Sequence, residues 1–258
     1  STGVITNTGG APVAVDTGHN LYVVSCTSTI LCTAIDSAGN EVTFNPVTPG
    51  TPTAYLIDVT PTRPLYSVSC FSAAQCVAVD NAGRAISFNP NGGAAPTVAS
   101  GPTGVDSSRD SALHSVSCYD ATHCSAVDNS GNQVAFTTAI AALNLTLVAA
   151  GNALPSVSCS SIAQCTAVDI AGQATTFNPQ TAAIISATST IDVQTGVFYG
   201  VSCPSASLCT ALTWDGRGFG WPPTTPPAAS AGTTLDGGNV FGAVSCVSST
   251  QCTGVDLS

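Results

Sequence analysis

The residues best suited to chemistry are twelve cysteines, which occur as six pairs with C-x5-C spacing. The pairs are Cys26/Cys32, Cys70/Cys76, Cys118/Cys124, Cys159/Cys165, Cys203/Cys209 and Cys246/Cys252. Structural zinc sites space their cysteines more closely and collect four donors at one centre. An even count with no cysteine left over instead indicates six disulfides, and hence a chain that matures in an oxidising compartment.

Acid–base chemistry has one candidate, a charged loop. Asp106, Arg109 and Asp110 precede His114 in the sequence, and we expect His19 on the same face. General acid–base catalysis needs a positioned pair of groups with displaced pKa values. A solvated loop with a local Arg–Asp pair is the competing interpretation, so we assign no catalytic residue.

The charge of the chain restricts its partners. It has no lysine, four arginines and fourteen acidic residues, with a formal net charge of −10. Nucleic-acid binding requires a basic surface, so neither nucleic acid nor an anionic membrane surface is an expected partner. A spanning segment needs about twenty apolar residues, and no such run occurs. With no signal peptide in the sequence, we expect a mature secreted chain.

The cysteine pairs belong to a repeat that must position them. The copy "LYSVSCFSAAQCVAVDNAGRAISFNP" starts at Leu65, and the others start at Leu21, Leu113, Leu154, Phe198 and Phe241. A period of about 44 residues with short apolar runs and glycine turns predicts a β-propeller with one four-stranded blade per repeat.

The second copy illustrates the expected strands. Strands A, B and C are predicted at Leu65–Cys70, Cys76–Asp80 and Arg84–Asn89, and Thr53–Val59 is strand D of the preceding copy. Each cysteine pair then straddles an A–B hairpin, where facing positions are close enough for a disulfide. The prediction is one disulfide within every blade.

The two ends of the chain predict how the propeller closes. The last copy stops after strand B, while Gly3–Thr8 and Pro12–Asp16 resemble strands C and D. We therefore expect one all-β domain, a six-bladed propeller whose sixth blade combines both termini and leaves no exposed edge. The blades would span about 21–60, 65–108, 113–150, 154–195, 198–237, and 241–258 with 1–17.

The pattern "SVSCxSxxxCxAVDxxGxxxxFN" resembles WD-type and related propeller repeats over nearly the whole chain. It looks closest to the cysteine-paired "SVSC…C.AVD..G" repeats of secreted bacterial proteins, in particular actinobacterial ones. The Gly-His and Trp-Asp dipeptides of WD repeats do not recur from copy to copy. The resemblance therefore implies the fold and not the scaffolding function of that family.

The second residue of each strand A should form a ring of equivalent positions: Tyr22, Tyr66, His114, Pro155, Tyr199 and Gly242. Tyrosine and histidine around an axial pocket suit stacking on sugars and hydrogen bonds to their hydroxyls. The alternative is that the tyrosines only fill the space between blades.

The fifth copy departs from the repeat at its B–C turn. Thr213 replaces the usual aspartate and Trp214 lies at the tip of the turn, close to Arg217. Trp221 takes the place of a recurring phenylalanine and is predicted to be core. An exposed tryptophan beside an arginine can stack on a sugar or aromatic ligand, so Trp214 and Arg217 join the candidate ligand-binding residues.

The remaining B–C turns have the pattern Asp-x-x-Gly, as in Asp36 to Gly39. The aspartate is expected to accept N–H groups of its own turn, and the glycine to supply positive φ. Calcium would need more converging oxygens than one aspartate per turn provides, so we predict no metal and no cofactor.

These observations favour a secreted, non-enzymatic binding module for carbohydrate or a cell-surface polymer. The alternative is a structural subunit of an extracellular filament, sheath or surface layer, which would bind copies of itself. A polysaccharide hydrolase or lyase is a third hypothesis. The sequon Asn144-Leu145-Thr146 leaves glycosylation open.

Overall fold

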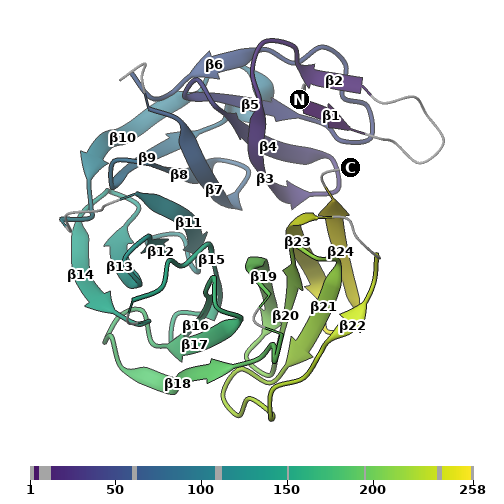
Figure 1. The fold of residues 1–258 in the computed structure, drawn as a ribbon. Helices are drawn as coiled ribbons and strands as arrows, with labels where there is room; N and C mark the ends of the chain where they lie inside the picture. The colour runs from purple at the N-terminus through teal and green to yellow at the C-terminus, as the bar shows by residue number, and fades with distance from the viewer. Residues whose placement is uncertain are drawn as a thin grey trace. The chain divides into compact units, whose positions relative to one another are not determined.

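Among the described residues, the regular secondary structure consists of antiparallel β-sheets and one 3-10 turn. The structure is a computed structural model and describes residues 3–5, 13–59, 63–107, 112–149, 151–194, 196–236 and 240–256. Five sheets have four strands each, and in each one the strands are adjacent in chain order (Figure 1). The predicted four-stranded blade for each of these repeats is confirmed.

The first blade consists of β3 (Leu21–Ser28), β4 (Leu31–Asp36), β5 (Asn40–Phe44) and β6 (Ala54–Leu56). The second consists of β7 (Leu65–Ser72), β8 (Gln75–Asp80), β9 (Arg84–Asn89) and β10 (Thr97–Gly104), with the 3-10 turn η1 (Asn91–Gly93) before β10. The third consists of β11 (Leu113–Cys118), β12 (His123–Asp128), β13 (Asn132–Thr137) and β14 (Ala142–Leu147).

The fourth blade consists of β15 (Ser156–Ser161), β16 (Gln164–Val168), β17 (Gln173–Phe177) and β18 (Ile184–Thr190). The fifth consists of β19 (Phe198–Ser205), β20 (Leu208–Thr213), β21 (Arg217–Trp221) and the short β22 (Thr233–Thr234). The chain ends contribute β1 (Gly3–Ile5) and β2 (Val13–Asp16), and β23 (Phe241–Ser248) and β24 (Gln251–Asp256).

The prediction of a sixth blade is wrong, because the described residues form five four-stranded blades. β1 pairs with β2 in one two-stranded sheet, and β23 pairs with β24 in another. A sixth blade would need ladder hydrogen bonds between β24 and β1, and no such pairing joins the described residues. Each hairpin closes a short loop, whereas joining the two would pair the most distant parts of the chain.

The chain divides into two compact units. One comprises Ser1–Cys124 with Phe136–Ala142, and the other Ser125–Ala135 with Leu143–Ser258. The first two blades lie in the first unit and the last two in the second, while the third blade contributes residues to both. Within the described residues, no helix has the length and apolar character needed to cross a membrane.

The six predicted disulfides are confirmed, and no cysteine is free. Each one links two cysteines six positions apart across the hairpin of strands A and B. The bonded pairs are Cys26–Cys32, Cys70–Cys76, Cys118–Cys124, Cys159–Cys165, Cys203–Cys209 and Cys246–Cys252.

In four of the complete blades, the second cysteine of each pair faces an aromatic residue of strand C across the ladder. Cys32 faces Phe44 across the ladder of β4 and β5, and Cys165 faces Phe177 in the fourth blade. Both cysteines are buried, as are their counterparts Cys76, Cys124 and Cys209. Because these sulfurs are oxidised and enclosed, they stabilise the blades and cannot contact a ligand.

Trp221 takes the place of the strand C phenylalanine in the fifth blade. It faces Cys209 across the ladder of β20 and β21 and is 1% exposed. Its predicted place in the core is therefore confirmed.

Each of the five four-stranded blades has one disulfide, as predicted, and the sixth disulfide lies outside them. Cys246 faces Cys252 across β23 and β24, which form a two-stranded sheet. No strand C among the described residues pairs with β24, so Cys252 lacks the cover that Phe44 gives Cys32, and it is exposed. This disulfide therefore links the strands of an isolated hairpin.

The serines of the "SVSC" motif connect neighbouring blades. Ser67 and Ser69 of β7 accept hydrogen bonds from the backbone N–H groups of Val116 and Cys118 in β11, at 3.1 and 3.0 Å. The same bond joins four further pairs: Ser25 to Cys70, Ser156 to Val201, Ser158 to Cys203 and Ser202 to Cys246. A short hydroxyl side chain thus satisfies edge N–H groups that would otherwise be buried without a partner.

Ser67→Ala is expected to lower the free energy of unfolding by about 1–3 kcal/mol, because it leaves a buried N–H of β11 without an acceptor. Denaturant unfolding with the disulfides intact measures the change. Ser72→Ala is the matched control, since Ser72 accepts the exposed N–H of Ala74 at 3.3 Å and makes no buried hydrogen bond among the described residues. Equal effects of the two substitutions would contradict a connecting role for Ser67.

The B–C turns form as predicted and also hold the end of strand D. In the first blade Asp36 Oδ1 accepts the N–H groups of Ala38 and Asn40, both at 2.8 Å, and Gly39 has φ of 86°. The Gly39 carbonyl in turn accepts the N–H groups of Ile57 and Asp58, which follow β6. This carbonyl contact recurs at Gly83, Gly131, Gly172 and Gly216, so each B–C turn fixes the chain entering the next blade.

Candidate ligand-binding site

A β-bulge presents the second residue of strand A. In β3, β7 and β19 the ladder to strand B shifts register across Tyr22, Tyr66 and Tyr199. A bulge adds one unpaired residue and re-aims its side chain. Each tyrosine is therefore the unpaired residue of its bulge, while the residue before it is paired to strand B.

Three of the predicted residues form a continuous aromatic surface in the first unit, here called the aromatic row. The rings of Tyr22 and Tyr66 meet edge to face with centroids 5.9 Å apart. Tyr66 and His114 stack at 5.5 Å with an interplanar angle of 25°. Tyr22 is 48% exposed, and Tyr66 and His114 are half-buried. The row therefore presents partly exposed aromatic rings on three neighbouring strands.

The spacing of the aromatic row follows from the packing of β3, β7 and β11 side by side (Figure 1). The serine bonds described above hold these strands together, one blade to the next. Rings at equivalent positions of adjacent strands then lie within contact distance. The row is thus held by the rigid strands and not by the loops.

The second unit holds two further predicted residues near each other in the fifth blade. Tyr199 is 44% exposed and Trp214 is 51% exposed. The N–H of Trp214 donates to the carbonyl of Val197 at 3.1 Å, which places the turn beside the start of β19. Pro155 and Gly242, at the equivalent positions of other repeats, supply no aromatic ring.

Arg217, predicted as a ligand contact, is buried and fully engaged with other side chains. Its Nη1 and Nη2 donate to Asp192 Oδ1 and Oδ2 at 2.8 and 2.7 Å, and its Nε donates to Asp215 Oδ2 at 2.9 Å. Only 6% of the residue is exposed. Burial opposes ionisation of Asp192, but the hydrogen bonds and charge of Arg217, together with the N–H groups of Gln194 and Gly196, outweigh it and lower the pKa of that carboxyl. Arg217 therefore stabilises the fold.

The charged loop is only partly visible, since Arg109 and Asp110 lie outside the described residues. Asp106 is buried, with 8% exposure, and its N–H donates to the carbonyl of Gly83. His19 lies beside the first B–C turn, with its Nδ1 3.2 Å from Asp36 Oδ2. His123 pairs with Asp120 in a disulfide hairpin.

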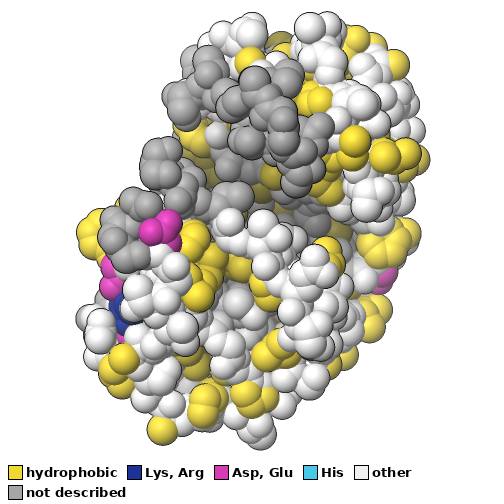
Figure 2. All heavy atoms as spheres, turned by 90° about the vertical axis from the view of Figure 1, so that its right-hand side faces the viewer, with side chains coloured by type: hydrophobic (Ala, Val, Ile, Leu, Met, Phe, Trp, Pro, Cys, Tyr) yellow, Lys and Arg dark blue, Asp and Glu magenta, His cyan; other side chains and the backbone are white. Residues whose placement is uncertain are grey.

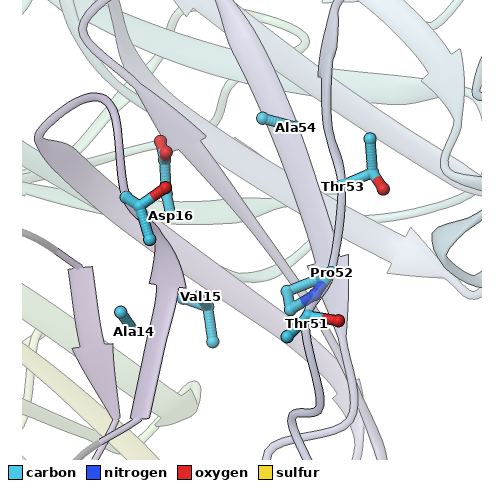
Figure 3. Close-up of a pocket in the computed structure, with 8 residues that line it drawn as sticks. Ala14, Val15, Asp16, Thr51, Pro52, Thr53 and Ala54 are labelled. Atoms are coloured by element: carbon cyan, nitrogen blue, oxygen red, sulfur yellow. The ribbon is translucent and has the colours of Figure 1, made fainter.

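Sequence reasoning missed one cluster, formed by Asp16, His19 and Asp36, whose ligand atoms all lie within 4.8 Å of one another. Asp16 also lines a groove of about 440 Å³ between β2 and the segment Thr51 to Ala54 (Figure 3). The signal was present, because an aspartate also follows the residue Ile57, Val105 or Ile191 at the end of strand D in other repeats. Asp16 follows Val15 in the same way near the N-terminus, so it is equivalent to these aspartates.

Asn144, the acceptor of the sequon, is already hydrogen-bonded. Its Nδ2 donates to the carbonyls of Pro179 and Gln180, both at 3.1 Å. The nitrogen that glycosylation would modify is therefore engaged in the folded second unit.

Comparisons with known proteins support the fold alone. No family model and no curated protein matches the chain. The structure of U3-55K is similar over 94% of this chain and 74% of its own, with a TM-score of 0.72 at 6% identity. YCF48 bound to a D1 peptide matches 98% and 81% of the two chains, with a TM-score of 0.67 at 10% identity. The RRP9 WD40 repeats match 86% and 68%, with a TM-score of 0.67 at 6% identity. The chain has a β-propeller fold.

Proposed function

We propose that this chain is a secreted, non-enzymatic binding module that holds an uncharged carbohydrate polymer on the aromatic row. The observation that carries the proposal is the direct contact of the Tyr22, Tyr66 and His114 rings across three adjacent strands. A row of rings on a rigid support provides contact area at a low cost in conformational entropy.

The chemistry of the row suits a sugar ring. The apolar face of a sugar packs on an aromatic ring, while its hydroxyls need donors and acceptors at the edge. A tyrosine hydroxyl can supply both. Several rings in sequence favour a polymer over a single sugar, because neighbouring subsites act together.

The rest of the surface supports an uncharged ligand outside the cell. Six intrachain disulfides indicate an oxidising environment. Most side chains visible in Figure 2 are hydrophobic or uncharged polar ones. The net charge of −10 repels anionic polymers, which leaves neutral polysaccharides as the favoured ligand class.

The test is affinity electrophoresis of the whole chain against soluble neutral β-glucan, xylan, mannan and α-glucan. We expect at least one polymer to retard the protein, and Tyr22→Ala with Tyr66→Ala to weaken that retardation at least about tenfold, as for buried aromatic anchors elsewhere. Phe71→Ala is the matched control, because Phe71 is 47% exposed at the opposite end of β7.

Binding that survives the double tyrosine substitution, or falls equally with Phe71→Ala, would contradict the assignment to the aromatic row. Trp214→Ala then decides whether Trp214 and Tyr199 form the binding surface instead. Absence of retardation by every polymer would refute the carbohydrate proposal.

A further inference from the structure

Arginine neutralises aspartates at two equivalent places between successive repeats. Arg84 of β9 ion-pairs with Asp58, which follows strand D of the first blade, at 2.9 Å, and with Asp80 of its own B–C turn. Both carboxylates are completely buried. Arg217 makes the equivalent bond to Asp192, which follows strand D of the fourth blade. At both places an arginine therefore pairs with the buried aspartate that follows strand D.

The β2 junction with the first blade has the same two aspartates without an arginine. Asp16 is the last residue of β2, and it is equivalent to Asp58, which follows β6. Asp36 begins the B–C turn of the first blade, and it is equivalent to Asp80 in the second. The residue at the position of Arg84 is Asn40, whose neutral Nδ2 donates to Asp36 Oδ2 at 2.6 Å. The two side chains are only 6% and 0% exposed, and no lysine or arginine among the described residues ion-pairs with either.

Asp16 is also incompletely hydrogen-bonded. Its Oδ1 accepts the N–H of Gly18 at 2.9 Å, but its buried Oδ2 has no hydrogen-bond partner among the described residues. The nearest nitrogen is His19 Nδ1, at 3.9 Å from Asp16 Oδ2 and 3.2 Å from Asp36 Oδ2. A buried carboxylate oxygen without a partner is costly, and here it faces the two other potential ligands.

We propose that Asp16, His19 and Asp36 bind one divalent cation of the zinc class, which takes the place of the arginine found at the junctions of Asp58 and Asp192. Zinc accepts histidine nitrogen and carboxylate oxygen at about 2.0–2.2 Å, so tetrahedral donors lie roughly 3.4 Å apart. The two separations above bracket this value. Calcium needs six to eight oxygens, whereas this cluster offers two carboxylates and an imidazole nitrogen.

The surroundings suit such an ion. Asp36 is oriented by the N–H groups of Ala38 and Asn40, which act as the outer contacts that metal-binding carboxylates require. The His19 side chain is 45% exposed, which provides an entry path and room for a water as fourth ligand. The ion would cross-link β2 to the first blade beside the groove of Figure 3, a structural role independent of carbohydrate binding.

The test is a titration of the metal-free whole chain with ZnCl2, followed by isothermal calorimetry and by thermal denaturation. We expect one ion per chain, a higher melting temperature with zinc, and reversal by a chelator. His19→Gln and Asp16→Asn should each weaken binding at least about tenfold. Without zinc, Asp16→Asn should melt no lower than the parent chain, since it removes one of two close buried charges.

His123→Gln is the matched control, because His123 lies 3.0 Å from a single carboxylate, that of Asp120. Loss of binding in this variant equal to that in His19→Gln would overturn the assignment. So would a wild-type melting temperature that zinc leaves unchanged, or stabilisation by CaCl2 in place of ZnCl2. Since His19 is exposed, its replacement leaves the fold intact and the outcome interpretable.

Discussion

Arg217→Met is expected to lower the free energy of unfolding by about 3–5 kcal/mol, because it leaves the buried Asp192 carboxylate without its counter-ion. Methionine keeps much of the arginine stem, so the change tests charge more than volume. Denaturant unfolding with the disulfides intact measures it. A bidentate pair with 0% exposure at Asp192 gives a far larger effect than a surface ion pair would.

Two variants make this expectation specific. Arg63→Met removes the same charge at an exposed position and should change stability by no more than about 0.5 kcal/mol. Adding Asp192→Asn to Arg217→Met should recover part of the loss, because the unpaired charge is then gone. If Arg217→Met is as mild as Arg63→Met, the buried ion pair contributes no more than a surface one.

The second large effect concerns Glu41, which makes stability depend on pH. Burial raises the pKa of Glu41 from 4.5 to about 7, and the hydrogen bond from Thr43 Oγ1 to Oε2 at 2.7 Å offsets only part of this. The folded chain therefore holds the proton more tightly than the unfolded chain. The contribution of Glu41 to stability is therefore fully present below about pH 4.5, and about 3 kcal/mol of it is lost as the pH rises through 7.

Glu41→Gln should abolish this fall, so that the variant exceeds the parent chain by up to about 3 kcal/mol at pH 8 and matches it near pH 4. The third blade shows that an amide fits, because Gln133 occupies the equivalent position with 0% exposure and accepts from Ser125. Unfolding curves at a series of pH values measure the difference. A parent chain whose stability does not fall between pH 5 and 8 would show that Glu41 is ionised without penalty.

The strands themselves were largely predictable. β9 has the predicted bounds, Arg84–Asn89, because alternating apolar residues and the preceding Asp-x-x-Gly turn both define it. β6 is shorter than the predicted Thr53–Val59, since the N–H groups of Ile57 and Asp58 turn away to the Gly39 carbonyl. The prediction of a sixth blade was wrong because a repeat pattern identifies strands but contains no information on whether β1 and β24 pair.

The candidate site was predictable in composition and not in contacts. The repeat alignment placed Tyr22, Tyr66 and His114 at equivalent positions, but the ring contacts depend on the bulge and on strand packing. The alignment wrongly predicted that Arg217 is available to a ligand. Its buried partner Asp192 precedes it by 25 residues and follows a strand of another blade. Such a pair can be recognised only from the structure, which shows that the residues after strand D pack against the B–C turn of the next blade.

All six disulfides join residues only six positions apart, and this has a consequence for the covalent continuity of the molecule. No disulfide spans two blades, so the polypeptide backbone is the only covalent link from one blade to the next. A single cut by a protease between two blades would leave fragments that separate on a non-reducing denaturing gel. Under native conditions, hydrogen bonds such as that from Val116 to Ser67 and the packing between blades would have to hold a nicked molecule together.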